Sequence, residues 1–281
     1  MKKILTLFSV LLILALAACG GNAENSEDAT SDEGTDQEQT TIKIGASSVP
    51  HAEILEEAAP LLAEKGIELD IEPYEDYVLP NDDLASGELD ANYFQHIPYL
   101  EQTVADTGYE LTHIGGIHIE PMGVYSKSIA NIDDIPEGTE VILSNSVSDH
   151  GRILGLFQSE GLLTIDESVD VAEAQIGDIV DNPKDLTFTP DFDPAFLPEL
   201  YEAEEDTLVV INTNFAIEAG LNPLEDSLFI EGEESPYVNV IAVKEDDEND
   251  EALQTLVDVL HSEDMQNFIL DNYEGAVVPV N

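Results

Sequence analysis

The sequence contains very few basic residues. It has eight Lys and Arg against 61 Asp and Glu, for a formal net charge of -53 at pH 7. So acidic a surface repels nucleic-acid phosphates and anionic lipid headgroups, which excludes both as partners. Disordered acidic chains are poor in apolar residues, whereas 43% of this chain is hydrophobic, so we expect the acids to coat a folded body. The charge indicates adaptation to a salty environment, where counter-ions screen repulsion.

Cysteine and the common catalytic motifs are also scarce. Cys19 is the only cysteine, which excludes an intramolecular disulfide and leaves no thiol nucleophile in the body of the chain. There is no Gly-x-Ser-x-Gly sequence and no phosphate-binding glycine loop. We therefore predict no catalytic residues and no cofactor. A tethered extracellular enzyme remains an alternative function, although the sequence offers no candidate catalytic residues for it.

A metal site is weighed at His113, His118 and Glu120, because imidazole and carboxylate are common ligands. Strand alternation leaves His118 and Glu120 on one face and His113 on the other. We therefore expect no metal site, and we expect the six histidines to be surface or core residues.

The N-terminus has the pattern of a secretory signal. Lys2 and Lys3 precede an apolar run that ends in Leu16-Ala17-Ala18-Cys19, and the run is too short for a confident membrane span. This ending resembles the bacterial lipobox, in which the cysteine is lipidated and becomes the first residue. We predict a signal peptide over 1–18 and a lipid anchor at Cys19 on the extracytoplasmic face of the cell membrane. A plain signal peptide with a chance cysteine is the alternative.

Residues 19–40 are polar and acidic, with alanine as almost their only apolar residue, which predicts a disordered tether. From Thr41 the pattern is strand, helix, strand within about 30 residues, which is typical of a parallel α/β sheet. A second such series begins near Gly123 and indicates a second lobe. We expect residues 188–198 to be mostly loop, and one last helix from Asn249 to Asn272.

Aromatic and amide side chains are concentrated in the segment Asp90 to Tyr99, although the chain is only 6% aromatic and has no tryptophan. Tyr74, Tyr77 and the turn at Pro80 lie just upstream. Aromatic walls with a few polar groups are typical of small-molecule sites. The alternative is a helix start that packs its aromatic residues into the core.

Arg152 is the only arginine, and we expect it at the start of a helix that follows the polar loop 144–150. A guanidinium binds a carboxylate through two parallel hydrogen bonds, and a helix N-terminus adds free N–H groups. This predicts a receptor for the carboxylate of a small acid such as an amino acid. The alternative is a structural salt bridge to one of the many acids.

Several motifs together resemble the methionine-binding lipoproteins (NlpA type), the substrate-binding proteins of bacterial ABC importers. The resemblance covers Thr41 to Asn281, and its motifs are Tyr77 with Pro80-Asn81, Asp90 to Tyr99, Val124 to Lys127, Val210 to Asn214, Ala219 to Leu221 and Glu234 to Asn239. It implies a two-lobed α/β fold of the periplasmic-binding-protein type (type II) with a ligand cleft between the lobes. Lobe 1 would comprise 41–122 and 236–281, and lobe 2 would comprise 123–235.

The resemblance also implies a ligand, a site and partners. Tyr77, Phe94, His96 and Tyr99 would line a thioether pocket, Arg152 would hold the carboxylate, and Asn214 and Asn239 would bind the amino-acid head. The partners would be an ABC permease and its ATPase.

Two departures from the family pattern, at Ser148-Asp149 and at Phe192 to Glu199, leave the ligand open among L-methionine, D-methionine and a methionine-containing dipeptide. Another small amino acid is a further alternative. A tethered adhesin would leave Arg152 and the aromatic segment without a role.

Overall fold

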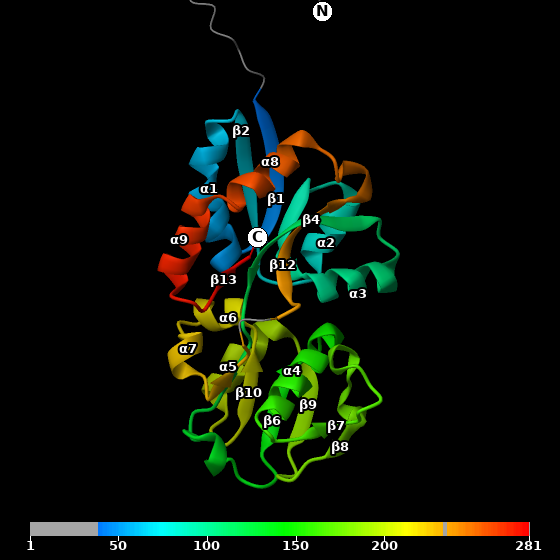
Figure 1. Ribbon diagram of the computed structural model, residues 1–281, viewed down its shortest axis with the longest axis vertical. Coiled ribbons are helices and arrows are strands. Elements are labelled where there is room, and N and C mark those ends of the chain that lie inside the picture. The colour runs from blue at the N-terminus through cyan, green and yellow to red at the C-terminus, as the bar shows by residue number, and fades with distance from the viewer. Residues whose placement is uncertain (1–38, 233–234, 281) are drawn as a thin grey trace, which may run out of the picture. The chain divides into compact units, whose positions relative to one another are not determined.

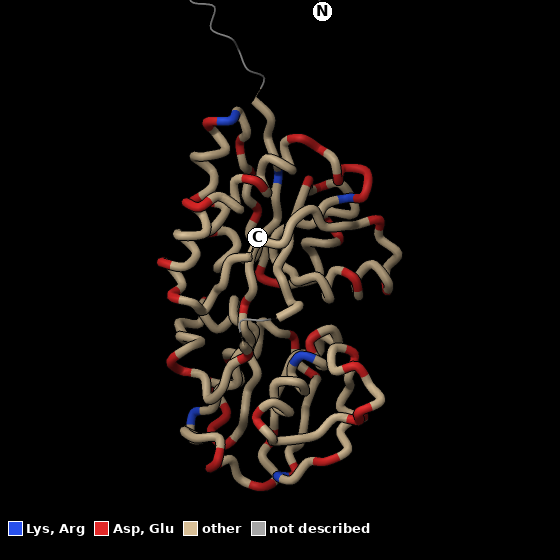
Figure 2. Tube along the Cα trace, in the orientation of Figure 1, with Lys and Arg blue, Asp and Glu red and all other residues tan. Residues whose placement is uncertain are grey.

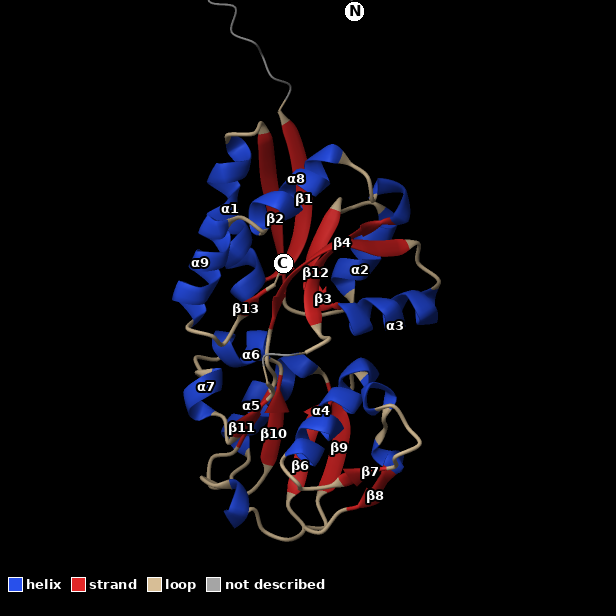
Figure 3. Ribbon diagram, in the orientation of Figure 1, coloured by secondary structure: helices blue, strands red, loops and turns tan. Residues whose placement is uncertain are grey.

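The structure is a computed structural model that describes residues 39–232 and 235–280 (Figure 1). The predicted signal peptide, Cys19 and all but the last two residues of the tether lie outside the described residues. Within the described part, no helix is long and apolar enough to cross a membrane. The α/β fold class predicted from the sequence is confirmed, because helices alternate with strands along the chain (Figure 3).

The first sheet is mixed and has six strands in the order β13-β4-β12-β3-β1-β2. Its strands are β1 (Thr40–Ser47), β2 (Ile67–Tyr74), β3 (Ala91–His96), β4 (Leu111–Ile119), β12 (Val238–Lys244) and β13 (Val278–Pro279). β1 is parallel to β2 and β3, whereas β12 is antiparallel to β3 and β4. The C-terminal part of the chain therefore returns to the sheet that the N-terminal part begins.

Helices cover both faces of this sheet. The helices are the π-helical turn η1 (Ser48–Ala52), α1 (Glu53–Ala63), α2 (Leu79–Ser86), α3 (Ile97–Thr107), the 3-10 turn η6 (Glu245–Asp247), α8 (Glu251–Leu260) and α9 (Glu263–Tyr273). α1, α8 and α9 pack on one face, and α2 and α3 pack on the other. Successive residues of β12 point to opposite faces, so Ile241 joins the first core and Val240 joins the second. A strand buried on both faces is mainly apolar, as β12 is from Val240 to Val243.

The second sheet has five strands in the order β11-β5-β10-β6-β9, and a two-stranded sheet of β7 and β8 lies nearby. Its strands are β5 (Gly123–Tyr125), β6 (Glu140–Ser144), β9 (Thr187–Phe192), β10 (Leu208–Ile211) and β11 (Phe229–Ile230), with β7 (Thr164–Ile165) and β8 (Ile179–Asp181) apart. The helices are α4 (Val147–Ser159), α5 (Leu197–Ala203), α6 (Thr213–Glu218) and α7 (Pro223–Asp226), with 3-10 turns η2 (Ile132–Asp134), η3 (Val171–Glu173), η4 (Ile176–Asp178) and η5 (Pro194–Phe196). α4 packs on one face of the sheet, and α5 and α6 pack on the other. Val210 and Val209 show the same alternation, each in a different core.

Three local expectations were wrong. Residues 187–192 form β9 rather than loop, and Pro190 is tolerated there because β9 is an edge strand. The expected last helix is two helices, since Ser262 caps α9 by accepting a hydrogen bond from the Met265 N–H. Helix α4 begins at Val147, so Arg152 lies in its second turn and not at its N-terminus.

Acidic residues are spread along the helices and loops around both sheets, and few basic residues lie among them (Figure 2). Most of these acids have exposed side chains, for example in the run Glu245 to Asp250. The surface therefore carries the charge that the composition predicts, while both cores are apolar.

Candidate ligand-binding site

One cavity is lined by residues from segments of both sheets. All seven residues predicted from the sequence border it, namely Tyr77, Phe94, His96, Tyr99, Arg152, Asn214 and Asn239. Five more residues, which sequence reasoning did not assign to the site, also line it, namely Gln95, Glu120, Asp149, Asn212 and Thr213. The structure therefore brings the predicted residues together and adds two carboxylates to them.

The apolar wall of the cavity is built from aromatic rings. The Tyr77 ring centroid lies 5.9 Å from that of Phe94, 6.0 Å from that of Tyr99 and 5.2 Å from that of Phe215. The Tyr99 hydroxyl donates to the Tyr77 carbonyl oxygen at 2.9 Å, which joins α3 to the loop before α2. Burial raises the pKa of Tyr77 well above its usual value, so its hydroxyl is a neutral donor. It donates to Asn214 Oδ1 at 2.6 Å.

The amides of the Asp90–Tyr99 segment have a mainly structural role. Asn92 Nδ2 donates to the Pro80 carbonyl oxygen at 3.1 Å and to Asn81 Oδ1 at 2.9 Å. Gln95 Nε2 donates to Asn81 Oδ1 at 2.7 Å, and Asn81 Nδ2 donates back to Gln95 Oε1 at 2.8 Å. These buried amides satisfy one another and tie the start of α2 to β3. Gln95 also borders the cavity, whereas Asn92 does not.

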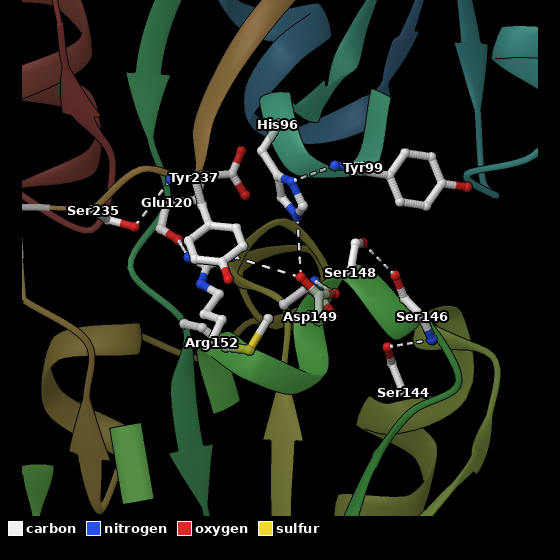
Figure 4. A network of polar contacts seen from close by, with 12 residues as sticks. His96, Tyr99, Glu120, Ser144, Ser146, Ser148, Asp149, Arg152, Ser235 and Tyr237 are labelled. Carbon is white, nitrogen blue, oxygen red and sulfur yellow. Dashed lines mark hydrogen bonds and ion pairs between the residues drawn. The ribbon is translucent and has the colours of Figure 1, made fainter. Parts of the chain in front are cut away.

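Arg152 is buried and ion-paired. Its Nη2 lies 2.6 Å from Glu231 Oε2, its Nε donates to the same oxygen at 2.8 Å, and its Nη2 donates to the Glu120 carbonyl oxygen at 2.5 Å. The guanidinium carbon lies 4.6 Å from the centroid of the Tyr237 ring (Figure 4). The salt-bridge interpretation and the binding-site interpretation of Arg152 therefore each describe part of what is observed. The same side chain forms a salt bridge and lines the cavity.

Asp149 lies one helical turn before Arg152 on α4, with its Oδ1 4.0 Å from Arg152 Nη1. His96 Nδ1 accepts the backbone N–H of Tyr99 at 3.1 Å, so the ring proton is on Nε2, which donates to Asp149 Oδ1 at 3.0 Å (Figure 4). Asn212 Nδ2 donates to Asp149 Oδ2 at 3.2 Å. Burial alone would raise the pKa of the Asp149 carboxyl, but the hydrogen bond from His96 and the charge of Arg152 hold it below its usual value.

Glu120 occupies the connection between β4 and β5 and is the centre of a buried network. Its Oε1 accepts from His118 Nε2 at 2.8 Å and lies 3.3 Å from His51 Nε2, while its Oε2 accepts the Asn214 N–H at 3.1 Å. His51 Nε2 also lies 3.0 Å from Asn239 Oδ1. Burial alone would raise the pKa of the Glu120 carboxyl, but His51, His118 and Arg152 reverse this and lower it. The carboxyl is therefore ionised at neutral pH.

The metal-ligating atoms of His51, His118 and Glu120 all lie within 4.8 Å of one another, so this set could hold a metal ion. His113 is exposed and takes no part, which agrees with the strand alternation. His51 Nε2 faces two acceptors, Glu120 Oε1 and Asn239 Oδ1, so it must carry a proton there. The geometry is therefore that of a hydrogen-bonded cluster.

The sequence contains signals for some of the missed residues. Asp149 precedes Arg152 by three positions, and side chains at that spacing share a face once the helix begins at Val147 instead of after the loop 144–150. Asn212 follows a buried strand, where ligand-binding loops of α/β folds lie. Glu120 shares a strand face with His118, but its partner His51 comes from a distant turn that no local pattern connects to it.

A ligand cavity lined by two α/β sheets, with an aromatic wall and a buried arginine, defines the class of two-lobed substrate-binding proteins. The family model described as NlpA lipoprotein matches residues 42–281, and the chain belongs to this family. The resemblance seen in the sequence motifs is thereby confirmed.

Relatives and solved structures agree with this assignment. The chain is 42% identical, over 100% of both chains, to the "Methionine-binding lipoprotein MetQ" of Bacillus subtilis (strain 168). A crystal structure of a "pheromone cOB1 precursor/lipoprotein, YaeC family" from Enterococcus faecalis V583 is 46% identical with a TM-score of 0.84, and covers 86% of this chain and 100% of its own. A nutrient-binding protein from Burkholderia cenocepacia, solved bound to methionine, is 34% identical with a TM-score of 0.80, over 85% of this chain and 100% of its own.

Proposed function

We propose that this protein binds methionine in the cavity between its lobes and delivers it to an ABC importer. The observation that carries the proposal is the combination, in one cavity, of an aromatic wall with a buried arginine. An amino acid with an unbranched apolar side chain matches both halves of such a site. The names of relatives, and a solved relative bound to methionine, support this choice of ligand.

We assign each side of the cavity to one part of the ligand. Tyr77, Phe94 and Tyr99 flank the thioether, where sulfur–ring contacts are favourable. His96 closes this wall, since its ring lies 6.2 Å from that of Tyr99 and it donates to Asp149. Arg152 binds the carboxylate, and Asn214 and Asn239 bind the amino-acid head.

The proposed role also sets the organisation of the chain. Lobe 1 comprises 41–122 and 236–281, and lobe 2 comprises 123–235. Lipidation of Cys19 anchors the protein to the extracytoplasmic face of the membrane, and the acidic tether 19–40 spans the distance to the folded body. A permease and its ATPase receive the ligand, and the protein itself catalyses no reaction.

The first test is to identify what the protein binds. We expect native mass spectrometry of the purified, undenatured protein to detect methionine, either L or D, or a methionine-containing dipeptide. Titration calorimetry should then give weaker binding for leucine and norleucine than for methionine, although one methylene decides only about 1–3 kcal/mol. Equal competition by charged or branched amino acids would refute the assignment of the aromatic wall.

A further inference from the structure

We propose that Glu120 is the specificity-determining carboxylate that binds the α-ammonium group of the amino acid, while Asn214, Asn239 and Arg152 present N–H donors to its carboxylate. This inference rests on the proposed function, because it assumes that the ligand is a zwitterionic amino acid. It divides the head-group site into an acidic side and a donor side.

The amide of Asn214 offers a donor to the ligand. Its Oδ1 accepts the Tyr77 hydroxyl at 2.6 Å, so the acceptor end of the amide is already occupied by a donor of the protein. A tyrosine hydroxyl with a raised pKa stays protonated and keeps that contact. The Nδ2–H groups of Asn214 are then left for the ligand, and they suit a carboxylate rather than an ammonium group.

The amide of Asn239 is oriented in the same sense by His51. The proton on His51 Nε2 is required because this nitrogen lies 3.0 Å from Asn239 Oδ1 and 3.3 Å from Glu120 Oε1. The Oδ1 of Asn239 is therefore an acceptor for His51, and its Nδ2–H groups are left for the ligand. Neither asparagine leaves an oxygen uncommitted for an ammonium group.

A buried ammonium group needs acceptors of its own, because an unpaired charge in a dry site is very costly. Among the residues that the structure describes (39–232 and 235–280), the carboxylates that line the cavity are Glu120 and Asp149. Asp149 is 1% exposed, and each of its oxygens already accepts from a side chain, His96 or Asn212. Glu120 is 7% exposed, and its Oε2 likewise accepts one hydrogen bond, from the backbone N–H of Asn214, so its greater exposure and its neighbours, not its lone-pair count, distinguish it from Asp149.

Glu120 also lies beside the groups that would hold the rest of the head. Its backbone carbonyl oxygen accepts from Arg152 Nη2, its Oε2 accepts from Asn214, and its Oε1 shares His51 with Asn239. The Glu120 carboxylate therefore lies next to the three donor residues. This arrangement is needed because the ammonium and carboxylate groups of an amino acid are attached to the same α-carbon.

The test compares two ligands that differ only in the amino group. Methionine and 4-(methylthio)butanoate share the thioether and the carboxylate, so the ratio of their dissociation constants isolates the ammonium contact. We expect the unsubstituted protein to prefer methionine by about 30- to several-thousand-fold, the range found when one side of a buried charge pair is removed. Calorimetry at constant pH and salt measures both ligands.

Matched carboxylate-to-amide variants then assign the contact. In Glu120→Gln we expect the ratio to fall below tenfold, chiefly because methionine binds more weakly. In Asp149→Asn we expect both ligands to lose affinity together, with the ratio preserved. Loss of the ratio in Asp149→Asn and its retention in Glu120→Gln would overturn the proposal, and so would an equal loss for both ligands in Glu120→Gln.

A glutamine at position 120 can set its Nε2–H groups against the Asn214 N–H, so a thermal melt accompanies each titration. If this variant does not fold, Glu120→Asp replaces it, because it keeps the charge and withdraws it by one methylene. The ratio should then fall at least tenfold, and an unchanged ratio refutes the proposal. Absence of methionine binding in the unsubstituted protein would instead refute the proposed function, which keeps the two failures distinct.

Discussion

Removal of the Arg152 guanidinium should weaken ligand binding and fold stability together. The side chain is 4% exposed and pairs with Glu231 at 2.6 Å, and it also donates to the Glu120 carbonyl oxygen in the connection between the sheets. Arg152→Ala therefore removes the proposed carboxylate partner and leaves the part-buried Glu231 carboxylate and the Glu120 carbonyl oxygen without this donor. Burial alone would lower the pKa of Arg152, but Glu231 and Asp149 raise it, so the charge is permanent.

The loss of affinity and the loss of fold stability are of similar size and have separate causes. Truncation of one side of a buried charge pair in a binding site costs about 2–5 kcal/mol, which is about 30- to several-thousand-fold in affinity. Loss of a buried ion-pair partner costs the fold about 3–5 kcal/mol. Because the Glu231 side chain is 16% exposed and can recover some hydration, we expect about 3 kcal/mol, at the lower end of that range.

Calorimetry and denaturant melts on three variants separate these effects. Glu231→Gln keeps the guanidinium at the cavity and removes the charge of its partner, so stability should fall while methionine affinity changes less than tenfold. Arg152→Lys should recover only part of the affinity, because a point charge cannot make two parallel hydrogen bonds. A folded Arg152→Ala protein that binds methionine as tightly as the unsubstituted protein would refute the carboxylate role.

Three further predictions concern protonation, salt and the anchor. Burial lowers the pKa of His51 from 6.5 to about 4, so the unfolded chain binds the extra proton and stability should fall by about 3 kcal/mol as the pH drops from 6.5 to 4. Urea melts of His51→Gln should lack this part of the acid loss, and an unchanged pH profile would contradict the assignment. The thermal midpoint should rise steeply from low salt and then level off, because a net charge of -53 repels itself until it is screened, and a flat curve would show that repulsion does not limit stability. Cys19→Ser should release the protein from membranes into the soluble fraction, and retention of the variant in the membrane fraction would contradict the predicted anchor.

The fold class could be predicted because its signals are local, and the individual site residues were predicted through the resemblance of several motifs to a known family. Alternation and apolar runs are properties of neighbouring residues, so β10 and the strand-helix-strand order from Thr41 are legible in the sequence. The segment Asp90 to Tyr99 combines a strand end with a helix cap, and it places Phe94, His96 and Tyr99 at one cavity.

Other features could not be predicted, because they depend on which distant segments become neighbours. No pattern near Glu120 indicates that His51 lies 3.3 Å away, since that contact exists only after the turn that follows β1 packs beside the end of β4. The edge position of β9 made a proline-containing strand possible, and an edge is a property of strand order rather than of residues.

Arg152 illustrates the division most clearly. Its uniqueness in an acidic chain marked it as a candidate for binding a ligand carboxylate, with a structural salt bridge as the alternative. The sequence offered 61 acids as partners and no means of choosing among them. The choice of Glu231 follows from the tertiary fold, which brings Arg152 on α4 within 2.6 Å of the carboxylate that directly follows β11. Strands, helices and motifs could therefore be predicted from the order of the residues. Charge pairing between distant residues was decided by tertiary packing, because Coulomb and hydrogen-bond energies depend on distances that only the folded chain sets.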